Sequence, residues 1–382
     1  MPTQFLNATL LHPAPMERTS FTVIDGRFTG FNQAPHAEDI QVDLDGQFVI
    51  PGLFDAQVNG VGGIMFNDNP SLDTIRHMSA VLATLGTTSF LPTLVSDDLE
   101  KVKLAIEAVA SAIALKVPGV RGIHLEGPFL NSQKKGVHNA QKFRKLDDNS
   151  IDLISTLTNG KTLITLAPEL TSPQLIAELV RRGIIVAAGH TMANFTQTQI
   201  ALKAGLTGFT HLFNAMPQIE SRNPGCIVAA LESKNSFCSL IVDGHHVDPA
   251  LLRMALRAKS GNQGMFLVSD AISSVGTDKK ELQLAGQKLF IKNGKCTTAE
   301  GTLAGAHLSL WEAVQNAAKL LNIEFATAVE MATATPAGFM HLDKEIGRIT
   351  ADLCADFLVL DQQKNLRQTW VAGQCVHDSL KN

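Results

Sequence analysis

The sequence predicts an α/β fold, a closed (β/α)8 TIM-like barrel with short strands at both chain ends. Two observations along the middle of the chain carry this prediction. Short apolar runs alternate with stretches of helical periodicity, and metal-binding or acid/base side chains follow most of those runs. Apolar strands that alternate with helices indicate a parallel sheet buried on both faces, and barrels hold their catalytic groups at the strand ends.

Eight apolar runs stand ~20–40 residues apart, which is the length of a βα unit. Eight units favour a closed barrel, although a doubly wound open sheet would give the same alternation. Helical periodicity fills the intervals, as in residues 99–115, 173–182 and 248–258. The eight runs are Phe48–Phe54, Thr88–Leu91, Val120–Leu125, Leu163–Ala167, Ile184–Ala188, Gly208–Leu212, Cys238–Val242 and Met265–Val268.

Short strands broken by turns are predicted at both chain ends. Strand-like segments precede Asp25-Gly26 and Asp45-Gly46, dipeptides that favour tight hairpin turns. Similar segments lie near the C-terminus, at residues 356–360 and 368–376. We therefore predict a small domain from residues 1–50 and 340–382, and a barrel domain from residues 51–339.

Length and charge narrow the classes of function. The chain of 382 residues is long enough for a large barrel and a small second domain. Hydrophobic residues make up 45% and charged residues 18%, which is the balance of a globular protein. A net charge of −4, without a basic block or stripe, gives no reason to expect a nucleic acid partner.

The cysteines and the N-terminal segment indicate in which cellular compartment the protein is expected. The five cysteines form no CxxC pair, which fits thiols in a reducing compartment better than a disulfide framework. We read no signal peptide, because no charged segment precedes a long apolar core at the N-terminus. No apolar run approaches the ~20 residues needed to span a bilayer. These features predict a cytoplasmic protein without a membrane partner.

Three residues at the ends of separate runs form the predicted metal site. Glu126 ends the third run, His190 follows the fifth and His211 lies in the sixth. A divalent ion that activates water needs about three protein ligands and an open position. One carboxylate and two imidazoles suit zinc, iron, manganese or cobalt. A single buried histidine is more often satisfied by a hydrogen bond, but three such residues at strand ends favour a metal site.

Two further residues are predicted to take part in catalysis. Asp270 ends the eighth run and is the expected general base, and the alternative is a helix N-cap at Ser269-Asp270. His138 lies in the loop after the third run, where it is placed to donate a hydrogen bond to an oxyanion. The alternative for His138 is an exposed loop histidine.

His246 and Arg222 are the predicted anion-binding residues. Arg222 lies in a loop that contains prolines, and its guanidinium is suited to bidentate contact with a phosphate. The alternative for Arg222 is a solvated surface position.

Six motifs together resemble a known family. The segment Val49–Gly60 is similar to the first-strand signature of the amidohydrolase superfamily. Within that superfamily the chain resembles the N-acetylglucosamine-6-phosphate deacetylases, from about residue 45 to residue 350. The other five motifs are His124-Leu-Glu-Gly-Pro-Phe, Ala188-Gly-His-Thr, Thr210-His-Leu-Phe-Asn-Ala-Met, Asp243-Gly-His-His-Val-Asp and Val268-Ser-Asp-Ala.

The resemblance implies hydrolysis of the acetamide of N-acetyl-D-glucosamine 6-phosphate to acetate and D-glucosamine 6-phosphate. It implies a small β-sandwich formed from both chain ends, metal ligation by Glu126, His190 and His211, and catalysis by Asp270. It also implies a homodimer in which Arg222 reaches the phosphate in the neighbouring subunit's site. The substrate contacts that it implies are Val137, His138, Asn214, Ala215, Arg222, His246, Leu303, Ala304, Gly305 and Ala306.

The first-strand motif departs from the superfamily pattern. Gln57 and Asn59 stand where the superfamily usually has a His-x-His metal pair. Neutral amides are poor ligands for a transition metal beside imidazoles, so we predict one divalent ion per subunit, with zinc favoured. Gln57 is then expected to hydrogen-bond the water at the metal, or the substrate.

Three other functions fit parts of this pattern. Dihydroorotase-like, hydantoinase-like or deaminase amidohydrolases are the nearest, but the chain lacks the His-x-His pair and a clear lysine for carbamylation. A phosphosugar isomerase or epimerase fits the barrel alone, because barrels host many chemistries. A non-catalytic sugar-phosphate binding protein would require the predicted metal residues to be accidental.

Overall fold

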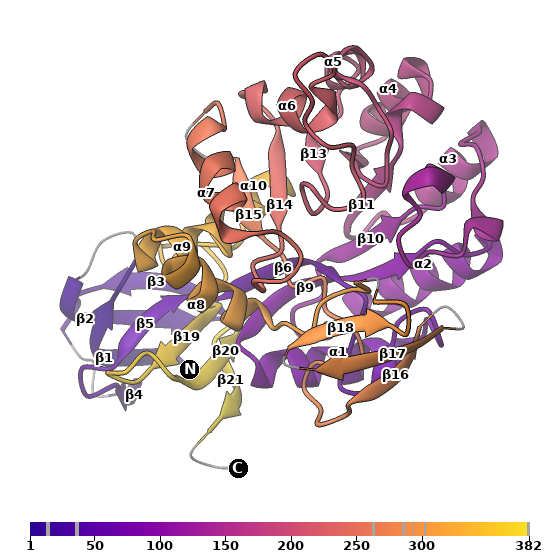
Figure 1. The fold of residues 1–382 in the computed structure, drawn as a ribbon. Helices are drawn as coiled ribbons and strands as arrows, with labels where there is room; N and C mark the ends of the chain where they lie inside the picture. The colour runs from indigo at the N-terminus through magenta and orange to yellow at the C-terminus, as the bar shows by residue number, and fades with distance from the viewer. Residues whose placement is uncertain are drawn as a thin grey trace.

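The computed structural model describes the chain except for residues 13–15, 35–37, 262–263, 285–286, 293, 302 and 380–382. Eight parallel strands form its central sheet, in the order β15-β14-β13-β12-β11-β10-β9-β6. A parallel bridge between Val58 and Ala271 joins the two ends of this order, so the sheet closes into a barrel (Figure 1). The strands are β6 (Leu53–Val58), β9 (Thr87–Val95), β10 (Gly122–Glu126), β11 (Lys161–Leu166), β12 (Ile185–Ala188), β13 (Gly208–Phe209), β14 (Phe237–Leu240) and β15 (Met265–Leu267).

Helices follow the barrel strands, and local sequence signals set where they begin. Ser172 caps α4 by accepting a hydrogen bond from the Leu175 N–H, and Pro173 occupies the first helical position. Asn194 and Ser309 begin α5 and α8 with reciprocal capping boxes. The helices are α1 (Leu72–Thr84), α2 (Leu99–Ala114), α3 (Asp148–Ile154), α4 (Pro173–Arg181), α5 (Phe195–Lys203), α6 (Gly225–Glu232), α7 (Pro249–Ala258), α8 (Leu310–Leu320), α9 (Phe325–Met331) and α10 (Ala334–Phe339). Short 3-10 turns are η1 (Ser132–Lys134), η2 (Ala140–Lys142) and η3 (Pro168–Leu170).

The barrel prediction is confirmed, and closure of the ring excludes the doubly wound open sheet. The three helices predicted by periodicity are α2, α4 and α7, each within one residue at either end. The prediction that the first apolar run, Phe48–Phe54, forms a single barrel strand was wrong. Its first half is β5 (Phe48–Pro51), which pairs with β19 outside the barrel.

A local backbone requirement explains why the chain changes sheets at residue 52. Pro51 has no N–H to donate, so it is suited to the end of a strand. Gly52 then passes close to Thr88, where a Cβ atom at position 52 would lie 2.2 Å from the Thr88 hydroxyl oxygen. The barrel therefore begins with β6, immediately after a residue that has to be glycine.

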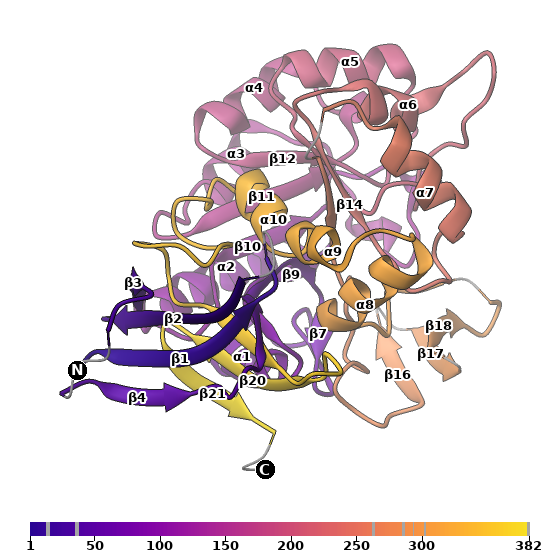
Figure 2. The same cartoon turned by 90° about the vertical axis from the view of Figure 1, so that its left-hand side faces the viewer.

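Strands from both chain ends form one hydrogen-bonded sheet of eight strands. In this sheet β4 and β5 both pair with β1, and Figure 2 shows the N-terminal and C-terminal strands on the same side of the barrel. Its core is aromatic: the ring centroids of Phe5 and Phe21 lie 4.9 Å apart, and those of Phe357 and Trp370 lie 5.4 Å apart. The strands are β1 (Thr3–Leu10), β2 (Met16–Ile24), β3 (Arg27–Phe31), β4 (Ile40–Asp43), β5, β19 (Phe357–Leu360), β20 (Leu366–Val371) and β21 (Gln374–Asp378). The predicted boundaries of the two domains, 1–50 with 340–382 and 51–339, stay a prediction.

Two small sheets lie near the mouth of the barrel. One, which the sequence did not predict, is the antiparallel β16 (Glu281–Leu284), β17 (Gln287–Lys292) and β18 (Lys295–Thr298). The other is the pair β7 (Gly60–Val61) and β8 (Ile64–Met65). Leu289 and Ile291 of β17 share an apolar cluster with Met65 and Ile272. Within the described parts of the chain, no helix combines the length and apolarity needed to cross a lipid bilayer.

Candidate active site

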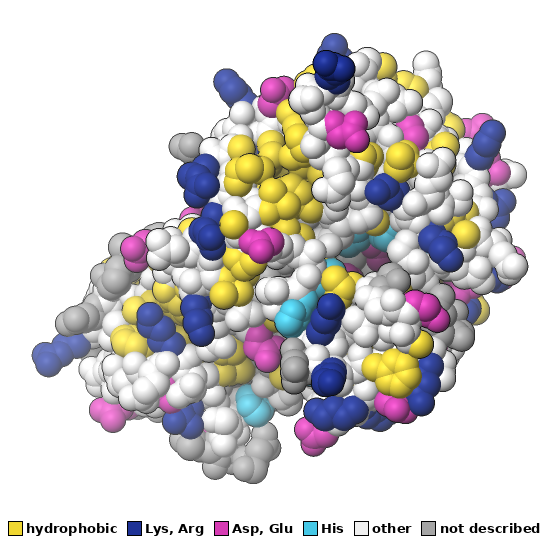
Figure 3. All heavy atoms as spheres, viewed as in Figure 1, with side chains coloured by type: hydrophobic (Ala, Val, Ile, Leu, Met, Phe, Trp, Pro, Cys, Tyr) yellow, Lys and Arg dark blue, Asp and Glu magenta, His cyan; other side chains and the backbone are white. Residues whose placement is uncertain are grey.

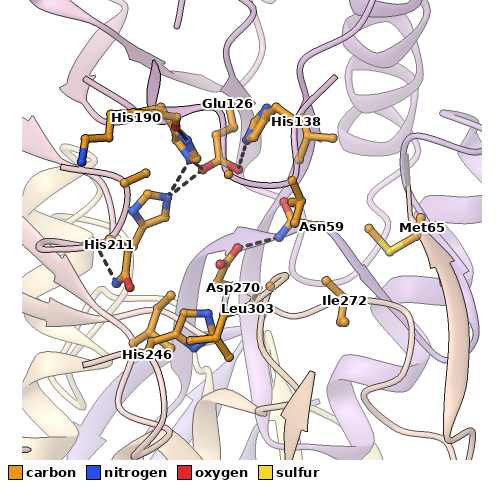
Figure 4. Close-up of a pocket in the computed structure, with 18 of the residues that line it drawn as sticks. Asn59, Met65, Glu126, His138, His190, His211, His246, Asp270, Ile272 and Leu303 are labelled. Carbon is orange, nitrogen blue, oxygen red and sulfur yellow. Dashed lines mark hydrogen bonds and ion pairs between the residues drawn. The ribbon is translucent and has the colours of Figure 1, made fainter. Parts of the chain in front are cut away.

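A cavity of about 330 Å³ opens at the carboxyl ends of the barrel strands, where barrel enzymes hold their active sites. Figure 3 shows histidine side chains in a hollow on this face, and Figure 4 shows the side chains pointing toward one another. The cavity gathers side chains that follow six strands: Asn59 after β6, Glu126 at the end of β10, His190 after β12, His211 after β13, His246 after β14 and Asp270 after β15.

The three predicted metal ligands converge in this cavity. Oε1 of Glu126 lies 3.0 Å from Nε2 of His211 and 3.3 Å from Nε2 of His190. The two ring nitrogens are 3.2 Å apart, and all three side chains are buried. Ligands at about 2.0–2.2 Å from one tetrahedral ion stand at about this separation from each other.

His190 shows whether a cation fits between these groups. Its Nδ1 lies 2.7 Å from the carbonyl oxygen of Lys134. A carbonyl oxygen only accepts, so Nδ1 carries the ring proton and Nε2 of the neutral ring is a lone pair. That lone pair faces an oxygen of the Glu126 carboxylate at 3.3 Å, and the two acceptors repel each other unless a cation lies between them. The donor set therefore fits a divalent metal ion.

His138 presents the opposite tautomer. The backbone N–H of Ser96 donates to its Nδ1 at 3.3 Å, and the Ser96 hydroxyl oxygen lies 2.9 Å from the same atom. Nδ1 is therefore an acceptor, and Nε2 of the neutral ring carries the proton. Glu126, His138 and His190 do offer potential ligand atoms within 4.8 Å of one another. The tautomer of His138 nevertheless favours a hydrogen-bond donor, and its burial excludes the exposed-loop alternative.

Asp270 is held by the two amides of the first-strand motif. Its Oδ1 accepts from Nδ2 of Asn59 at 2.6 Å and from Nε2 of Gln57 at 3.0 Å. Burial raises the pKa of Asp270 to about 6, and the nearby Glu126 carboxylate also raises it. A carboxyl with a raised pKa is suited to exchanging protons near neutral pH. No described helix begins at Asp270, so the N-cap alternative is wrong.

The backbone at the strand ends has an uncommon conformation. His190, His211 and Asp270 have positive φ angles of 48°, 34° and 50°. Residues other than glycine rarely adopt this region, and where they do they concentrate at functional sites. Each of these residues lies two or three positions beyond the end of a barrel strand, so the chain leaves the barrel at the point where its side chain enters the cavity.

The remaining predicted site residues differ in position. Ala304 is buried in the apolar cluster beside Met65, and the Ala306 N–H donates to the backbone oxygen of Asp270 at 3.0 Å. Arg222 is exposed, in the loop after β13, and is not among the residues that line the cavity of its own chain. The predicted substrate contacts that do line the cavity are Val137, His138, Asn214, Ala215, His246, Leu303 and Gly305.

Sequence reasoning gave no site role to several residues that shape the cavity. Asn59 holds Asp270 at 2.6 Å, and the alternation of side chains along a strand could have found it, since it shares a face with Gln57. Lys134 lines the cavity and donates from Nζ to the Met216 carbonyl oxygen at 2.9 Å. Met65 also lines it, from the β7–β8 pair. Lys134 and Met65 lie in elements of only two or three residues, η1 and β8, which are too short for a periodicity that indicates which way a side chain points.

Comparisons with known proteins agree on one family. The amidohydrolase family model matches residues 48–376. An N-acetylgalactosamine-6-phosphate deacetylase of Shewanella sp. is 38% identical over 95% of this chain and 93% of its own length. An N-acetylglucosamine-6-phosphate deacetylase of Haemophilus influenzae is 30% identical over 87% of each chain. The crystal structure of an N-acetylglucosamine-6-phosphate deacetylase from Pasteurella multocida superposes with a TM-score of 0.93, at 29% identity over 98% of this chain and 99% of that chain.

Proposed function

Because the chain belongs to the amidohydrolase family, we propose that it hydrolyses the acetamide of N-acetyl-D-glucosamine 6-phosphate to D-glucosamine 6-phosphate and acetate. One observation carries the proposal: a carboxylate and two imidazoles meet beside a buried aspartate at the mouth of the barrel. That arrangement is suited to metal-assisted hydrolysis. The names of the relatives support an acetylated phosphosugar as substrate, rather than the cyclic amides of the rival amidohydrolases or the substrate of an isomerase.

A second substrate has specific support. The Shewanella relative, at 38% identity, is named for N-acetylgalactosamine 6-phosphate, which differs from the glucosamine compound in configuration at C4. The bond that is broken is the same in both sugars, so the same catalytic groups serve either one. The two substrates are distinguished by experiment below.

The proposed chemistry divides between the ion and the chain. A divalent ion held by Glu126, His190 and His211 would polarise the amide carbonyl and make water a better nucleophile. Asp270 accepts the proton of the attacking water and returns it to the departing amine. His138 donates its Nε2–H to the carbonyl oxygen as negative charge develops there.

The two amides of the first strand keep Asp270 ready for this exchange. Asn59 and Gln57 both donate to Oδ1, which leaves Oδ2 to take and release the proton. Their N–H groups, not lone pairs, therefore face Asp270 where the superfamily has its second pair of imidazoles. We propose one ion per subunit, with zinc favoured. Metal analysis of the purified protein should give one tightly held equivalent, and two equivalents would contradict this assignment.

The proposal also covers assembly and compartment. We propose a homodimer in which Arg222 contacts the phosphate in the neighbouring subunit, which accounts for an exposed arginine outside its own cavity. A cytoplasmic location is supported by Cys226, Cys238 and Cys296, which are buried as thiols and not joined in disulfides.

Acetate release tests the proposed function directly. The protein would be stripped of metal, restored with zinc, and incubated separately with the 6-phosphates of N-acetyl-D-glucosamine and N-acetyl-D-galactosamine and with both unphosphorylated sugars. We expect metal-dependent release of acetate and of the free amine from a phosphorylated sugar. The kcat/KM values for the two phosphosugars assign the C4 preference. Formation of an isomer without acetate would overturn the proposal in favour of an isomerase.

A further inference from the structure

The loop after β14 contains a side-chain pair that the mechanism above does not use. Oδ2 of Asp243 lies 2.6 Å from Nδ1 of His246, and the two side chains are only 5% and 8% exposed. Oδ1 of the same carboxylate accepts from the backbone N–H groups of His245 and His246, at 2.8 and 2.9 Å. Three donors from one short loop therefore fix the orientation of the Asp243 carboxylate.

This pair determines which atom His246 presents to the cavity. A carboxylate only accepts, so Nδ1 of His246 carries a proton and Nε2 is the ring nitrogen left for a ligand. Burial raises the pKa of Asp243, but the hydrogen bond and charge of His246 outweigh burial and lower it overall, so the carboxylate is ionised. The His246 ring lies at the cavity wall beside Leu303 and Asp270, as Figure 4 shows.

The other basic side chains that line the cavity within the described residues have different partners. Lys134 donates to the Met216 carbonyl oxygen. His190 and His211 face Glu126, and His138 is held by Ser96. An anion in the cavity therefore meets Nε2 of His246 as the imidazole that the hydrolytic centre does not use, while the Lys134 ammonium keeps two further N–H donors. With a proton on each ring nitrogen, His246 is a cation that lies between the bound anion and the Asp243 carboxylate. Asp243, on the side away from the cavity, stabilises that positive charge.

We propose that Asp243 is a positioning residue for phosphate recognition. It holds His246 with Nε2 toward the cavity and stabilises the imidazolium that binds the phosphate of the sugar. This inference rests on the proposed function, because it takes the phosphosugar as the ligand. Asp243 acts only through His246, so its contribution disappears when His246 is replaced.

A double-mutant cycle tests the coupling. Asp243→Asn keeps the side-chain oxygen that accepts from the backbone but places an amide donor against Nδ1, so that Nδ1 no longer carries a proton and the imidazolium loses its counter-charge. His246→Gln keeps a polar group at the cavity wall without the charge. We expect each single variant to raise KM for the phosphosugar by about tenfold or more, while kcat changes by less than about threefold. The double variant should be no worse than His246→Gln alone. If Asp243→Asn has the same effect in both backgrounds, the carboxylate acts through the loop and not through His246, and the inference fails.

A binding measurement identifies the group that His246 contacts. Calorimetry of the metal-loaded protein would compare D-glucosamine 6-phosphate with D-glucosamine. Asp243→Asn should weaken binding of the phosphorylated amine by about tenfold or more and leave the unphosphorylated amine unchanged. Equal weakening of both would assign His246 to a hydroxyl and overturn the phosphate assignment.

Two controls separate this inference from loop stability and from the proposed function. Asp248 caps α7 in the same loop by accepting from the Ala250 N–H, and asparagine caps about as well, so Asp248→Asn should match the wild type in both measurements. If the wild-type protein binds D-glucosamine 6-phosphate but releases no acetate from the substrate, the proposed function is wrong, while the role of Asp243 in binding phosphate still stands. If the enzyme is active but the effects of Asp243→Asn and His246→Gln are additive in the double variant, only the proposed role of Asp243 is wrong.

Discussion

At the scale of single residues, the roles of His190 and His138 depend on the group that faces Nδ1 of each ring. His190 donates from Nδ1 to a carbonyl oxygen, whereas His138 accepts there from a backbone N–H. The cavity-facing Nε2 atoms therefore differ, with a lone pair suited to a cation at His190 and an N–H suited to an oxyanion at His138. The same residue type serves two roles because different loops supply the partner.

The role of Asp270 gives the first prediction at this scale. Asp270→Asn keeps the size of the side chain and an oxygen for Asn59 and Gln57, but removes the group that exchanges protons. We expect kcat to fall by about 10²–10⁴-fold. Bound metal should be unchanged, because Glu126, His190 and His211 are intact. Near-normal acetate release by a metal-loaded Asp270→Asn variant would contradict the assignment, and Asp278→Asn, at an exposed carboxylate further along the loop, is the matched control.

The pKa of Asp270 predicts the acid side of the pH profile. Burial and the Glu126 carboxylate raise this pKa to about 6. A general base has to be ionised, so kcat/KM should be constant above the pKa of Asp270 and fall tenfold per pH unit below it. A bound cation favours the ionised form, which places the acid limb at or below that value. A profile measured on the metal-loaded enzyme that begins to fall clearly above it would show that another group titrates.

At the scale of elements, the barrel and the flanking sheet are joined by a charged pair. Arg121, just before β10, donates to Asp356 at 2.7 Å and to the Ser89 hydroxyl at 2.9 Å. Asp356 directly precedes β19 and is 3% exposed. The pair thus connects two sheets whose strands are more than two hundred residues apart in sequence.

Removing this arginine should destabilise the whole protein. Arg121→Met leaves the Asp356 carboxylate buried without its cation, which costs about 3 kcal/mol because an uncompensated buried charge is expensive. Urea unfolding followed by circular dichroism should show a lower midpoint. Arg181→Met removes an exposed pair with Glu178 and should change stability by less than about 1 kcal/mol. Equal effects of the two substitutions would show that the Arg121 pair does not join the sheets as described.

The elements also show what could be predicted from the sequence. All eight apolar runs overlap barrel strands, the first only at Leu53 and Phe54, because strands buried on both faces are apolar throughout and helices between them keep their own period. The run at Phe48–Phe54 failed because two strands of different sheets follow each other without a polar break, with Pro51 and Gly52 between them. The sheet β16–β18 was missed because it follows the eighth apolar run. Eight runs already account for a complete barrel, so no further strands were expected there.

Within the site, residues at the ends of strands could be predicted from the sequence, whereas residues that act through loop contacts could not. Glu126, His190 and His211 could be predicted because they lie at or just beyond the ends of strands that meet by the geometry of the barrel. The roles of Ser96 and Asp243 could not be predicted. Ser96 acts through a contact with His138 in a different loop, and Asp243 acts through a contact with His246 in its own turn. Such contacts depend on backbone positions that no periodicity encodes.

At the scale of the whole molecule, the cavity of one chain lacks the arginine that the resemblance assigns to the phosphate. Arg222 is exposed in the loop after β13, so the proposed dimer requires that it act in the partner's site. A symmetric dimer has two such exchanges, one in each direction. This arrangement can be tested by separating Arg222 and Asp270 into different chains.

Co-expression of Arg222→Ala and Asp270→Asn chains with different affinity tags would give a purified heterodimer. If Arg222 acts in the partner's site, one of the two sites combines an intact Asp270 with an intact Arg222, and activity should return to about half of the wild-type value. Each homodimer should be defective, the Arg222→Ala enzyme by a KM raised about tenfold or more and the Asp270→Asn enzyme in kcat. If Arg222 instead served its own chain, the site with an intact Asp270 would lack the arginine. The heterodimer would then retain the raised KM, and the two results differ most at substrate concentrations below that KM.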